Sequence, residues 1–456
     1  MKRLKLKDQL GSYNNIKINR SYLEGNIRCP PSKSYTHRAI AIATLSSGCS
    51  KIINPLFSRD TNATINGCKK LGATISETIE NDNSEEKSNE LHGRPVLIVC
   101  GKETLDTPDD VINAENSGTT IRILASMSGL VRNGYSILTG DESLRKRPMK
   151  PIISALNQLG VESFSSNSNG TPPLIIKGGG IKGGTAIIDG SISSQFVSSL
   201  LISCIYSKKD VSLKVSGKQV SSPYIESTIA TMNHFGVSVN TDTSEYFIPR
   251  SHYIPTEFTV PGDFSTGALL IAAGILSSKE SILISGLNFD LPQGDMKIID
   301  IVKEMGGEIN VDKVNGNMRI YRSNELKGIH CNLFNSPDLL PVVSILSLIS
   351  KSPVTISGIS HARFKETDRV HNIATEFQKM GVNVTETQDS LKIIAPSSIK
   401  RSRLNAYGDH RLFMAFTIAS LLTHSSVVSG VDSVDVSFPS FIQNMKELGA
   451  DIQFSN

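Results

Sequence analysis

The sequence of 456 residues has no apolar run that approaches about 18 residues without a polar interruption, so it predicts no membrane-spanning helix. Its first residues, MKRLKLKDQLGS, are basic but lack the apolar core of about 7–15 residues that a secretory signal needs. We therefore expect a cytoplasmic protein without a membrane partner.

Strong charge of either sign is also missing. The 47 Lys and Arg residues nearly balance the 43 Asp and Glu residues, which leaves a net charge of +4. This excludes a general electrostatic attraction to nucleic acid, and any binding of anions must come from local groups of cations. With 39% apolar and 20% charged residues, the composition is that of an ordinary soluble globular protein of two or three domains.

Cysteine is sparse and scattered. There is no CxxC pair and no Cys/His spacing typical of a zinc site, so we expect no metal. We expect reduced and mostly buried thiols, as in a cytosolic protein, at all six positions: Cys29, Cys49, Cys68, Cys100, Cys204 and Cys331.

What the sequence does contain is a sixfold repeat. One recurring phrase is a helical segment, a glycine and a short strand, as in CKKLGATI and MKELGADI. Glycine suits this place because helices often end in a left-handed residue that only glycine adopts cheaply. The six glycines of the phrase are Gly72, Gly160, Gly236, Gly306, Gly381 and Gly449.

A second phrase alternates with the first: a polar start followed by an almost wholly apolar helix, as in NSGTTIRILASMSGL and GDHRLFMAFTIASLL. Helices that are apolar all round are buried. We therefore predict six α/β repeats, three per domain. The first domain is expected at 31–258 and the second at 1–30 plus 259–456. The polar stretch Glu80–Pro95 is expected to be an exposed insertion loop.

Chemically capable residues gather at the predicted helix starts. Ser, Asp and Asn are ordinary N-caps, so capping explains each of them singly. It does not explain Lys and Arg at the same starts, because cations oppose the helix dipole there. Helix starts that combine free N–H groups with cations predict a site for phosphate or carboxylate. These residues are Lys33, Ser34, Arg38, Asn116, Ser117, Gly118, Arg147, Ser193, Ser194, Gln195, Ser221, Tyr224, Asp338, Lys365, Glu366, Asp368, Arg369, Asp409, His410 and Arg411.

The motifs at these starts resemble the 5-enolpyruvylshikimate-3-phosphate synthase family over nearly the whole chain. In order, they are PPSKSYTHR, NSGTTIRIL, TGDESLRKRPM, GSISSQFVSSLL, VSSPYI, NSPDLLP, RFKETDR and YGDHR. The resemblance implies an α/β (α+β) fold of two domains, each of three βαβαββ repeats in an inside-out α/β barrel, with the active site between them. That agrees with the six repeats found independently.

The resemblance also implies the reaction: transfer of the enolpyruvyl group of phosphoenolpyruvate to the 5-hydroxyl of shikimate 3-phosphate, by addition and then elimination of phosphate. Asp338 and Glu366 are the implied acid–base pair, and Lys33 is a further candidate proton carrier. The division of roles among the three stays open. No metal or cofactor is implied, the partners are the two small substrates, and we expect a monomer whose domains close on the substrates.

Binding roles follow from the same motifs. The residues implied for shikimate 3-phosphate are Lys33, Ser34, Arg38, Ser193, Ser194, Gln195, Ser221, Tyr224, Asp338, His361 and Lys365. Those implied for phosphoenolpyruvate are Lys33, Asn116, Gly118, Arg147, Gln195, Arg369, His410 and Arg411. Two positions depart from the family pattern. Val436 stands where a lysine is usual, which removes one cation, and His361 stands where many relatives have asparagine.

Three other functions compete with this prediction. UDP-N-acetylglucosamine enolpyruvyl transferases usually carry a cysteine in the loop equivalent to GDESLRKRPM and a Lys-Asn pair, whereas this chain has no cysteine there and reads Lys33-Ser34. An RNA 3′-phosphate cyclase would need a basic groove and a nucleophilic histidine, and neither is evident. A non-enzymatic repeat scaffold would not place Asp, Glu and Arg at the starts of buried helices.

Overall fold

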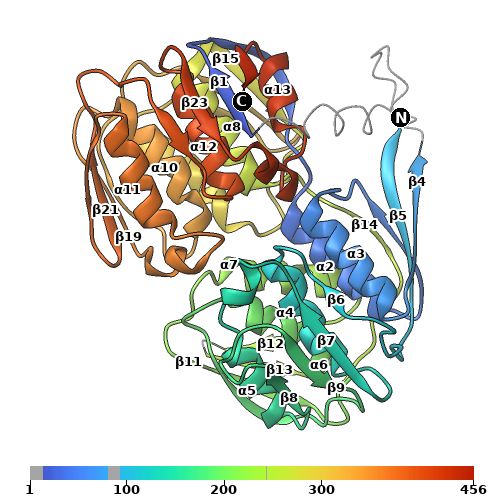
Figure 1. The fold of residues 1–456 in the computed structure, drawn as a ribbon. Coiled ribbons are helices and arrows are strands. Elements are labelled where there is room, and N and C mark those ends of the chain that lie inside the picture. The colour runs from blue at the N-terminus through green and yellow to red at the C-terminus, as the bar shows by residue number, and fades with distance from the viewer. Residues whose placement is uncertain (1–13, 81–92, 243, 456) are drawn as a thin grey trace. The chain divides into compact units, whose positions relative to one another are not determined.

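The computed structural model describes residues 14–80, 93–242 and 244–455 (Figure 1). Two sequence-based predictions lie outside the described residues. One is that the basic first residues are not a signal peptide, and the other is that the Glu80–Pro95 stretch, most of which is not described, is an exposed loop. The chain forms two compact units. The N-unit comprises Pro31–Pro261 and Asp290–Gln293; the C-unit comprises the residues up to Pro30, Gly262–Phe289 and the chain from Gly294 onward. The sequence-based boundary after residue 258 stays a proposal.

The N-unit contains three four-stranded sheets with one shared pattern, in which a parallel pair is followed by two antiparallel pairs. In sheet order they are β14 (Glu257–Thr259), β3 (Gly48–Ile53), β5 (Arg94–Gly101) and β4 (Thr74–Glu80); β6 (Ile112–Asn113), β7 (Tyr135–Thr139), β9 (Leu174–Lys177) and β8 (Ser163–Ser165); and β10 (Gly184–Asp189), β11 (Val211–Ser216), β13 (Glu245–Ile248) and β12 (Asn240–Thr241).

The C-unit repeats the pattern three times more, and the start of the chain supplies β2 and β1. Its sheets are β16 (Ile309–Asp312), β17 (Asn317–Tyr321), β15 (Ser278–Ser285) and β2 (Leu23–Arg28); β18 (His330–Asn332), β19 (Val354–Ser357), β21 (Ser390–Ile394) and β20 (Asn383–Glu386); and β22 (Arg403–Asn405), β23 (Ser426–Ser429), β1 (Asn15–Ile18) and β24 (Ile452–Ser455). In the described residues the strands form six separate open sheets rather than a closed barrel.

Each repeat also carries one buried and one amphipathic helix, as the sequence predicts. The buried helices are α2 (Lys33–Leu45), α4 (Gly118–Ser128), α6 (Ser194–Cys204), α8 (Phe264–Ser277), α10 (Leu340–Leu346) and α12 (His410–Ser420). The amphipathic helices are α3 (Arg59–Lys70), α5 (Lys150–Gln158), α7 (Pro223–His234), α9 (Ile298–Glu304), α11 (Arg369–Lys379) and α13 (Phe441–Glu447).

The six-repeat prediction is confirmed in its most specific detail. All six repeat glycines, from Gly72 to Gly449, have φ between +80° and +105°, the left-handed region that favours glycine. Within the C-unit, α8, α10 and α12 pack against one another, so their polar starts lie together. The sequence places the reactive residues at these starts.

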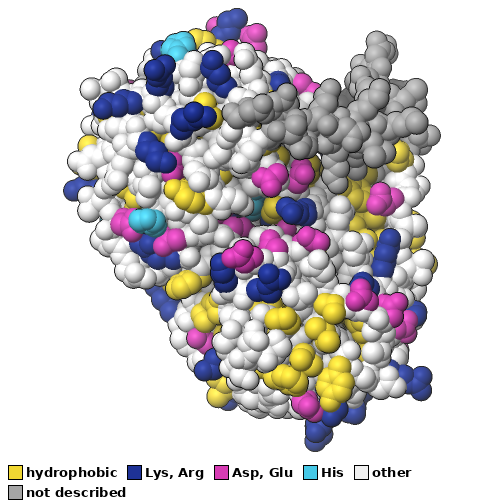
Figure 2. Space-filling model, viewed as in Figure 1, with side chains coloured by type: hydrophobic (Ala, Val, Ile, Leu, Met, Phe, Trp, Pro, Cys, Tyr) yellow, Lys and Arg dark blue, Asp and Glu magenta, His cyan; other side chains and the backbone are white. Residues whose placement is uncertain are grey.

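The surface agrees with the small net charge. On the face drawn in Figure 2, Lys and Arg side chains lie interspersed with Asp and Glu. None of the described helices has the length and apolar character that a membrane crossing needs.

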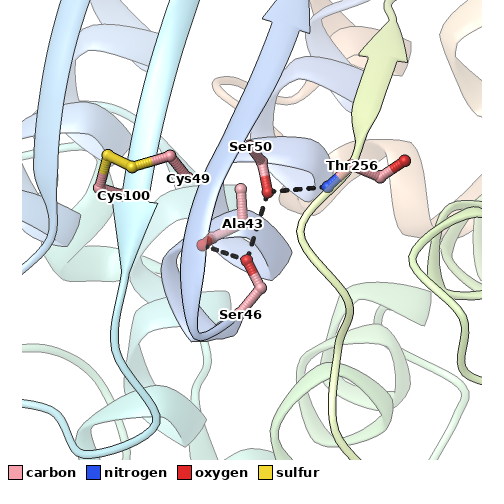
Figure 3. Close-up of a disulfide and its surroundings, with 6 residues drawn as sticks. All are labelled: Ala43, Ser46, Cys49, Ser50, Cys100 and Thr256. Carbon is pink, nitrogen blue, oxygen red and sulfur yellow. Dashed lines mark hydrogen bonds between the residues drawn. A yellow bond between two sulfur atoms is a disulfide. The ribbon is translucent and has the colours of Figure 1, made fainter.

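One sequence-based expectation is wrong: not all six cysteines are reduced. Cys49 on β3 and Cys100 on β5 form a disulfide (Figure 3). The two residues are direct partners in the antiparallel register of these strands, which brings their β-carbons together. Their spacing of 51 residues hides this pairing in the sequence. Cys29, Cys68, Cys204 and Cys331 are buried free thiols, as expected.

The disulfide predicts the thiol count. Protein that is denatured in the presence of an alkylating agent directly after cell lysis should show four alkylated cysteines. Reduction before alkylation should raise the number to six. The Cys49→Ser/Cys100→Ser variant should lose about 2–4 kcal/mol of unfolding free energy, because the bond restrains a long loop of the unfolded chain. Mass spectrometry and urea unfolding measure both, with Cys204→Ser as the control for a buried thiol. Six free thiols before reduction would contradict the bond.

Candidate active site

In the C-unit, several charged side chains surround the guanidinium of Arg369. Arg369, the first residue of α11, donates from Nη1 to Asp338 Oδ1, from Nη2 to Glu366 Oε2 and from Nε to Asp409 Oδ2, each at 2.7 Å. Its side chain is 1% exposed. Arg411 Nη2 lies 2.9 Å from the second oxygen of Asp338. Two cations and three carboxylates therefore form a single buried cluster.

The local fold explains this convergence. Asp338 lies on a short 3₁₀ turn, Pro337–Leu339, directly before α10. Asp409 is the N-cap of α12 and accepts from the backbone N–H of Arg411 at 2.8 Å. Arg411 Nη1 donates to the carbonyl of Ser265 at the start of α8. The starts of three buried helices thus supply the cluster, and the start of α11 supplies its centre.

From the spacing in the KETDR motif we expect Lys365 and Arg369, four residues apart, on one helical face, and Asp368 as a first-turn acid or a partner that orients Arg369. Lys365 does not share a helical face with Arg369, because α11 begins only at Arg369. Lys365 nevertheless reaches the same carboxylate, with Nζ 3.9 Å from Asp338 Oδ1. Asp368 does not orient Arg369. It is the N-cap of α11, accepting from His371 N at 3.0 Å, and its ion pair is with Arg363. Its structural role was one of the predicted possibilities.

The electrostatics of the cluster favour the ionised state. Burial opposes the negative charge of Asp338, but Arg411, Lys365 and Arg369 outweigh it and hold the pKa of this carboxyl well below its usual range. Burial works in the same way against Lys365 and lowers the pKa of its ammonium, with Asp338 partly restoring it. The pKa of the Lys365 ammonium thus lies below its ordinary value.

His361 lies on the 3₁₀ turn Ser360–Phe364 beside this cluster. It is 7% exposed, its ring packs edge-on against Phe334, and among the described residues neither ring nitrogen has a hydrogen-bond partner. Burial, helped by Lys365, lowers the pKa of His361 to about 4. The ring is therefore neutral at pH 7 and keeps one N–H available as a donor.

The buried state of His361 predicts a pH dependence of stability. The unfolded chain binds a proton at His361 below the ordinary pKa of 6.5, while the folded chain does not until about pH 4, so stability falls as pH drops through this window. His361→Asn should remove about 2 kcal/mol of the loss between pH 7 and pH 5. Urea unfolding at both pH values measures this, with the exposed His371→Asn as control. An unchanged pH dependence would contradict it.

The N-unit holds a second group around Arg38 of α2. This buried guanidinium donates from Nε to Thr228 Oγ1 at 2.7 Å, from Nη2 to the carbonyl of Tyr224 at 2.8 Å, and from Nη1 to Ser34. Burial lowers the pKa of Arg38 to about 10. Arg38 thus connects Ser34 on α2 to the backbone of Tyr224 on α7.

A third group surrounds Gly118, the first residue of α4. Arg147 Nη2 donates to Asn116 Oδ1 at 2.8 Å, and Arg122 Nη1 donates to Gln195 Oε1 at 2.6 Å. A β-carbon at Gly118 would lie 3.0 Å from Nη1 of both Arg122 and Arg147. A larger residue here would therefore press against both guanidiniums at this helix start.

The remaining predicted residues of the N-unit lie at or near helix starts. Ser193 is the N-cap of α6 and accepts from Gln195 N; Ser194 begins that helix. Ser221 has φ +56° directly before α7, and Pro223 begins α7 as expected. Pro148 does not begin a helix: α5 starts at Lys150 and carries Pro151 in its first turn. Arg147 therefore precedes α5 by a short loop.

Sequence reasoning missed two residues of the N-unit groups and undervalued one of the C-unit cluster. Arg122 lies one helical turn after Gly118, and a cation inside an otherwise apolar helix was the available signal. Asp60 binds Lys33 Nζ at 3.1 Å, a contact across 27 residues that no local pattern shows. Asp409 looked like a simple cap, but it also binds Arg369.

Val436 lies at the end of the 3₁₀ turn Val431–Val436 and is buried, so an apolar side chain replaces the lysine usual in the family. Within the described part of the chain, no group of three His, Cys, Asp or Glu side chains is arranged to hold a metal ion.

The fold matches solved structures over nearly its whole length. EPSP synthase from Acinetobacter baumannii superposes with a TM-score of 0.79, covering 97% of this chain and 100% of that one at 24% identity. Six repeated α/β modules with cation-rich helix starts define an enolpyruvyl transferase fold.

The sequence comparisons identify the family. The family model for EPSP synthase (3-phosphoshikimate 1-carboxyvinyltransferase) matches residues 18–445. Curated proteins named 3-phosphoshikimate 1-carboxyvinyltransferase are 42% identical in Methanocaldococcus jannaschii, covering 94% of this chain and 97% of that protein, and 42% identical in Nitrosopumilus maritimus, covering 96% and 99%. The chain belongs to the EPSP synthase family and is a transferase.

Proposed function

We propose that this chain transfers the enolpyruvyl group of phosphoenolpyruvate to the 5-hydroxyl of shikimate 3-phosphate, which gives 5-enolpyruvylshikimate 3-phosphate and phosphate. The observation that carries the proposal is the buried cluster in which Arg369 joins Asp338 to Glu366, with Arg411 on the other side of Asp338. It combines two carboxylates for proton transfer with two guanidiniums for a substrate carboxylate.

The reaction needs a proton transfer from the 5-hydroxyl and a proton transfer to C3, and only the second is reversed later. The 5-hydroxyl adds to C2 of phosphoenolpyruvate and loses its proton, while the methylene carbon C3 gains one. Phosphate then leaves from C2, and C3 returns its proton to restore the double bond. We assign Asp338 as the base for the hydroxyl and Glu366 as the group that serves C3, with Lys33 as a further proton carrier.

The cations have matching roles. Arg369 and Arg411 bind the carboxylate of phosphoenolpyruvate, and His410 lies beside its phosphate. Asn116, Gly118, Arg147, Gln195 and Lys33 bind its phosphate. Shikimate 3-phosphate is held by Ser34, Arg38, Ser193, Ser194, Ser221, Tyr224, His361 and Lys365. In the free protein Asp338 and Glu366 occupy donors of Arg369, so the incoming carboxylate competes with them for the same guanidinium.

We further propose that the chain acts as a monomer in the cytoplasm without metal or cofactor. The carboxylates and cations of this chain suffice for addition and elimination. Disulfides are rare in cytoplasmic proteins. The thiol count described above therefore also tests whether the bond is present in protein taken directly from the cytoplasm.

A coupled assay tests the proposed function. Purified protein is mixed with phosphoenolpyruvate and shikimate 3-phosphate, and phosphate release is followed together with formation of the enolpyruvyl product by mass spectrometry. We expect release that requires both substrates. Absence of release across varied pH and salt, or release only with UDP-N-acetylglucosamine as acceptor, would overturn the proposal.

A further inference from the structure

Lys33 has a carboxylate partner in the N-unit that the family motif does not include. Lys33 begins α2, and its Nζ lies 3.1 Å from Oδ2 of Asp60 in the first turn of α3. The Asp60 side chain is 6% exposed and that of Lys33 is 16% exposed. The pair therefore joins the starts of two helices and leaves the ammonium partly accessible.

Asp60 is not needed to cap its own helix. Ser58 and Thr61 form a complete capping box at the start of α3, in which each side chain bonds the backbone N–H of the other. An exposed acid in a first turn adds only about 0.3–1 kcal/mol through the helix dipole. Burying the carboxylate costs more than this unless a cation compensates, and Lys33 is a cation in contact with it.

The backbone of Asp60 is tied to a third helix start. Thr120 of α4 donates from Oγ1 toward the Asp60 carbonyl at 3.3 Å and lies 2.7 Å from Oγ of Ser117, the N-cap of α4. Thr64 of α3 bridges Thr120 to His37 of α2, with both distances 2.7 Å. A buried chain of hydroxyl groups thus links α2, α3 and α4.

We propose that Asp60 is the positioning residue for Lys33. Its carboxylate holds the ammonium in one place beside the start of α4, where the N–H groups of the helix and Arg147 await an anion. Because the hydroxyl chain fixes Asp60 itself, the lysine has a defined position before substrate arrives. This inference rests on the proposed function, in which Lys33 contacts phosphoenolpyruvate and carries a proton.

Preorganisation explains why such a contact affects catalysis. A free lysine side chain samples many rotamers, and a substrate that binds it must restrict them. A carboxylate partner restricts them beforehand, and it also offsets the repulsion between Lys33 and the cations around Gly118. The expected loss on removing Asp60 is therefore in the use of phosphoenolpyruvate rather than in folding.

The test removes the charge of Asp60 while keeping its shape. Asp60→Asn should lower kcat/KM for phosphoenolpyruvate by about 10–100-fold, as expected when a catalytic group is misplaced. Asp60→Glu, which keeps the charge, should recover part of the loss. In a Lys33→Ala background, Asp60→Asn should change kcat/KM by less than about 3-fold, because the group on which it acts is gone. Asp110→Asn is the matched control. It removes an exposed ion pair with Lys70, which lies on α3 like Asp60.

A second measurement does not depend on the reaction. Acetic anhydride labels lysines according to their freedom and exposure, and peptide mass spectrometry reads each site. Labelling of Lys33 should rise in Asp60→Asn while that of Lys70 stays constant. Equal Lys33 labelling in both proteins, or losses from Asp60→Asn and Lys33→Ala that multiply, would overturn the proposal. If Lys33 is labelled faster in Asp60→Asn but the unmodified protein releases no phosphate, the Asp60–Lys33 link is upheld and the proposed function is overturned.

Discussion

Replacing Glu366 by glutamine should lower turnover by about 100-fold or more, the scale expected when an acid–base group is lost. The amide keeps the shape of the side chain, and its oxygen can still accept from Arg369 Nη2, which it now does at 2.7 Å. The cluster should therefore stay assembled while its proton transfer at this position is lost. Binding of shikimate 3-phosphate should remain nearly intact. Steady-state kinetics and calorimetric titration measure the two effects.

A matched control for this substitution lies nearby. Glu386 on β20 pairs with Arg363 and His371 outside the cluster. Glu386→Gln should leave turnover within about 2-fold, because this surface pair contributes little. If Glu366→Gln retains full turnover as well, Glu366 is only an ion-pair partner of Arg369, and the proton at C3 must come from another group such as Lys33.

Replacing Arg369 by lysine should raise KM for phosphoenolpyruvate by about 10–100-fold, the equivalent of one or two lost charge-assisted hydrogen bonds. Lysine keeps the charge but lacks the planar fork that now reaches Asp338, Glu366 and Asp409 together. The fully buried Asp409 would lose its closest cation, so the free energy of unfolding should also fall by about 3–5 kcal/mol. Kinetics and urea unfolding measure both effects.

Arg363→Lys is the control for this change. Arg363 also bridges acidic groups, with Asp368 and Glu386 as partners, but it does not contact the cluster. Its substitution should cost some stability and leave KM for phosphoenolpyruvate unchanged. A normal KM in Arg369→Lys would show that the substrate carboxylate binds elsewhere. Arg411, which holds the second oxygen of Asp338, would be the first alternative.

The repeats and the helix starts are local features, and the sequence predicts them well. The left-handed glycines follow each amphipathic helix because helix ends need such a residue wherever they occur, so Gly72 and Gly449 could be assigned without a fold. The same holds for the caps Ser193 and Asp409 and for the apolar helices behind them. The family motifs then attach the chemistry to these local positions.

Contacts between distant segments were not predictable in this way. Lys33 with Asp60, Arg122 with Gln195 and Cys49 with Cys100 depend on how helices and strands pack. Lys365 and Arg369 show the opposite error, since a spacing of four suggested a shared helical face although the helix begins only at the second of them. Both still reach Asp338, Lys365 from the segment before the helix and Arg369 from its first residue.

The sequence by itself determined six α/β repeats, the polar starts of their buried helices and the family to which the chain belongs, because periodicity, capping and motifs are written in neighbouring residues. Only the tertiary structure decided that Arg369 binds three carboxylates at once, that Asp60 holds Lys33 and that two cysteines are joined. These pairings join residues that are distant in the sequence. Buried charges need a partner, and packing decides which group supplies it. Strand register decides which cysteines lie opposite each other.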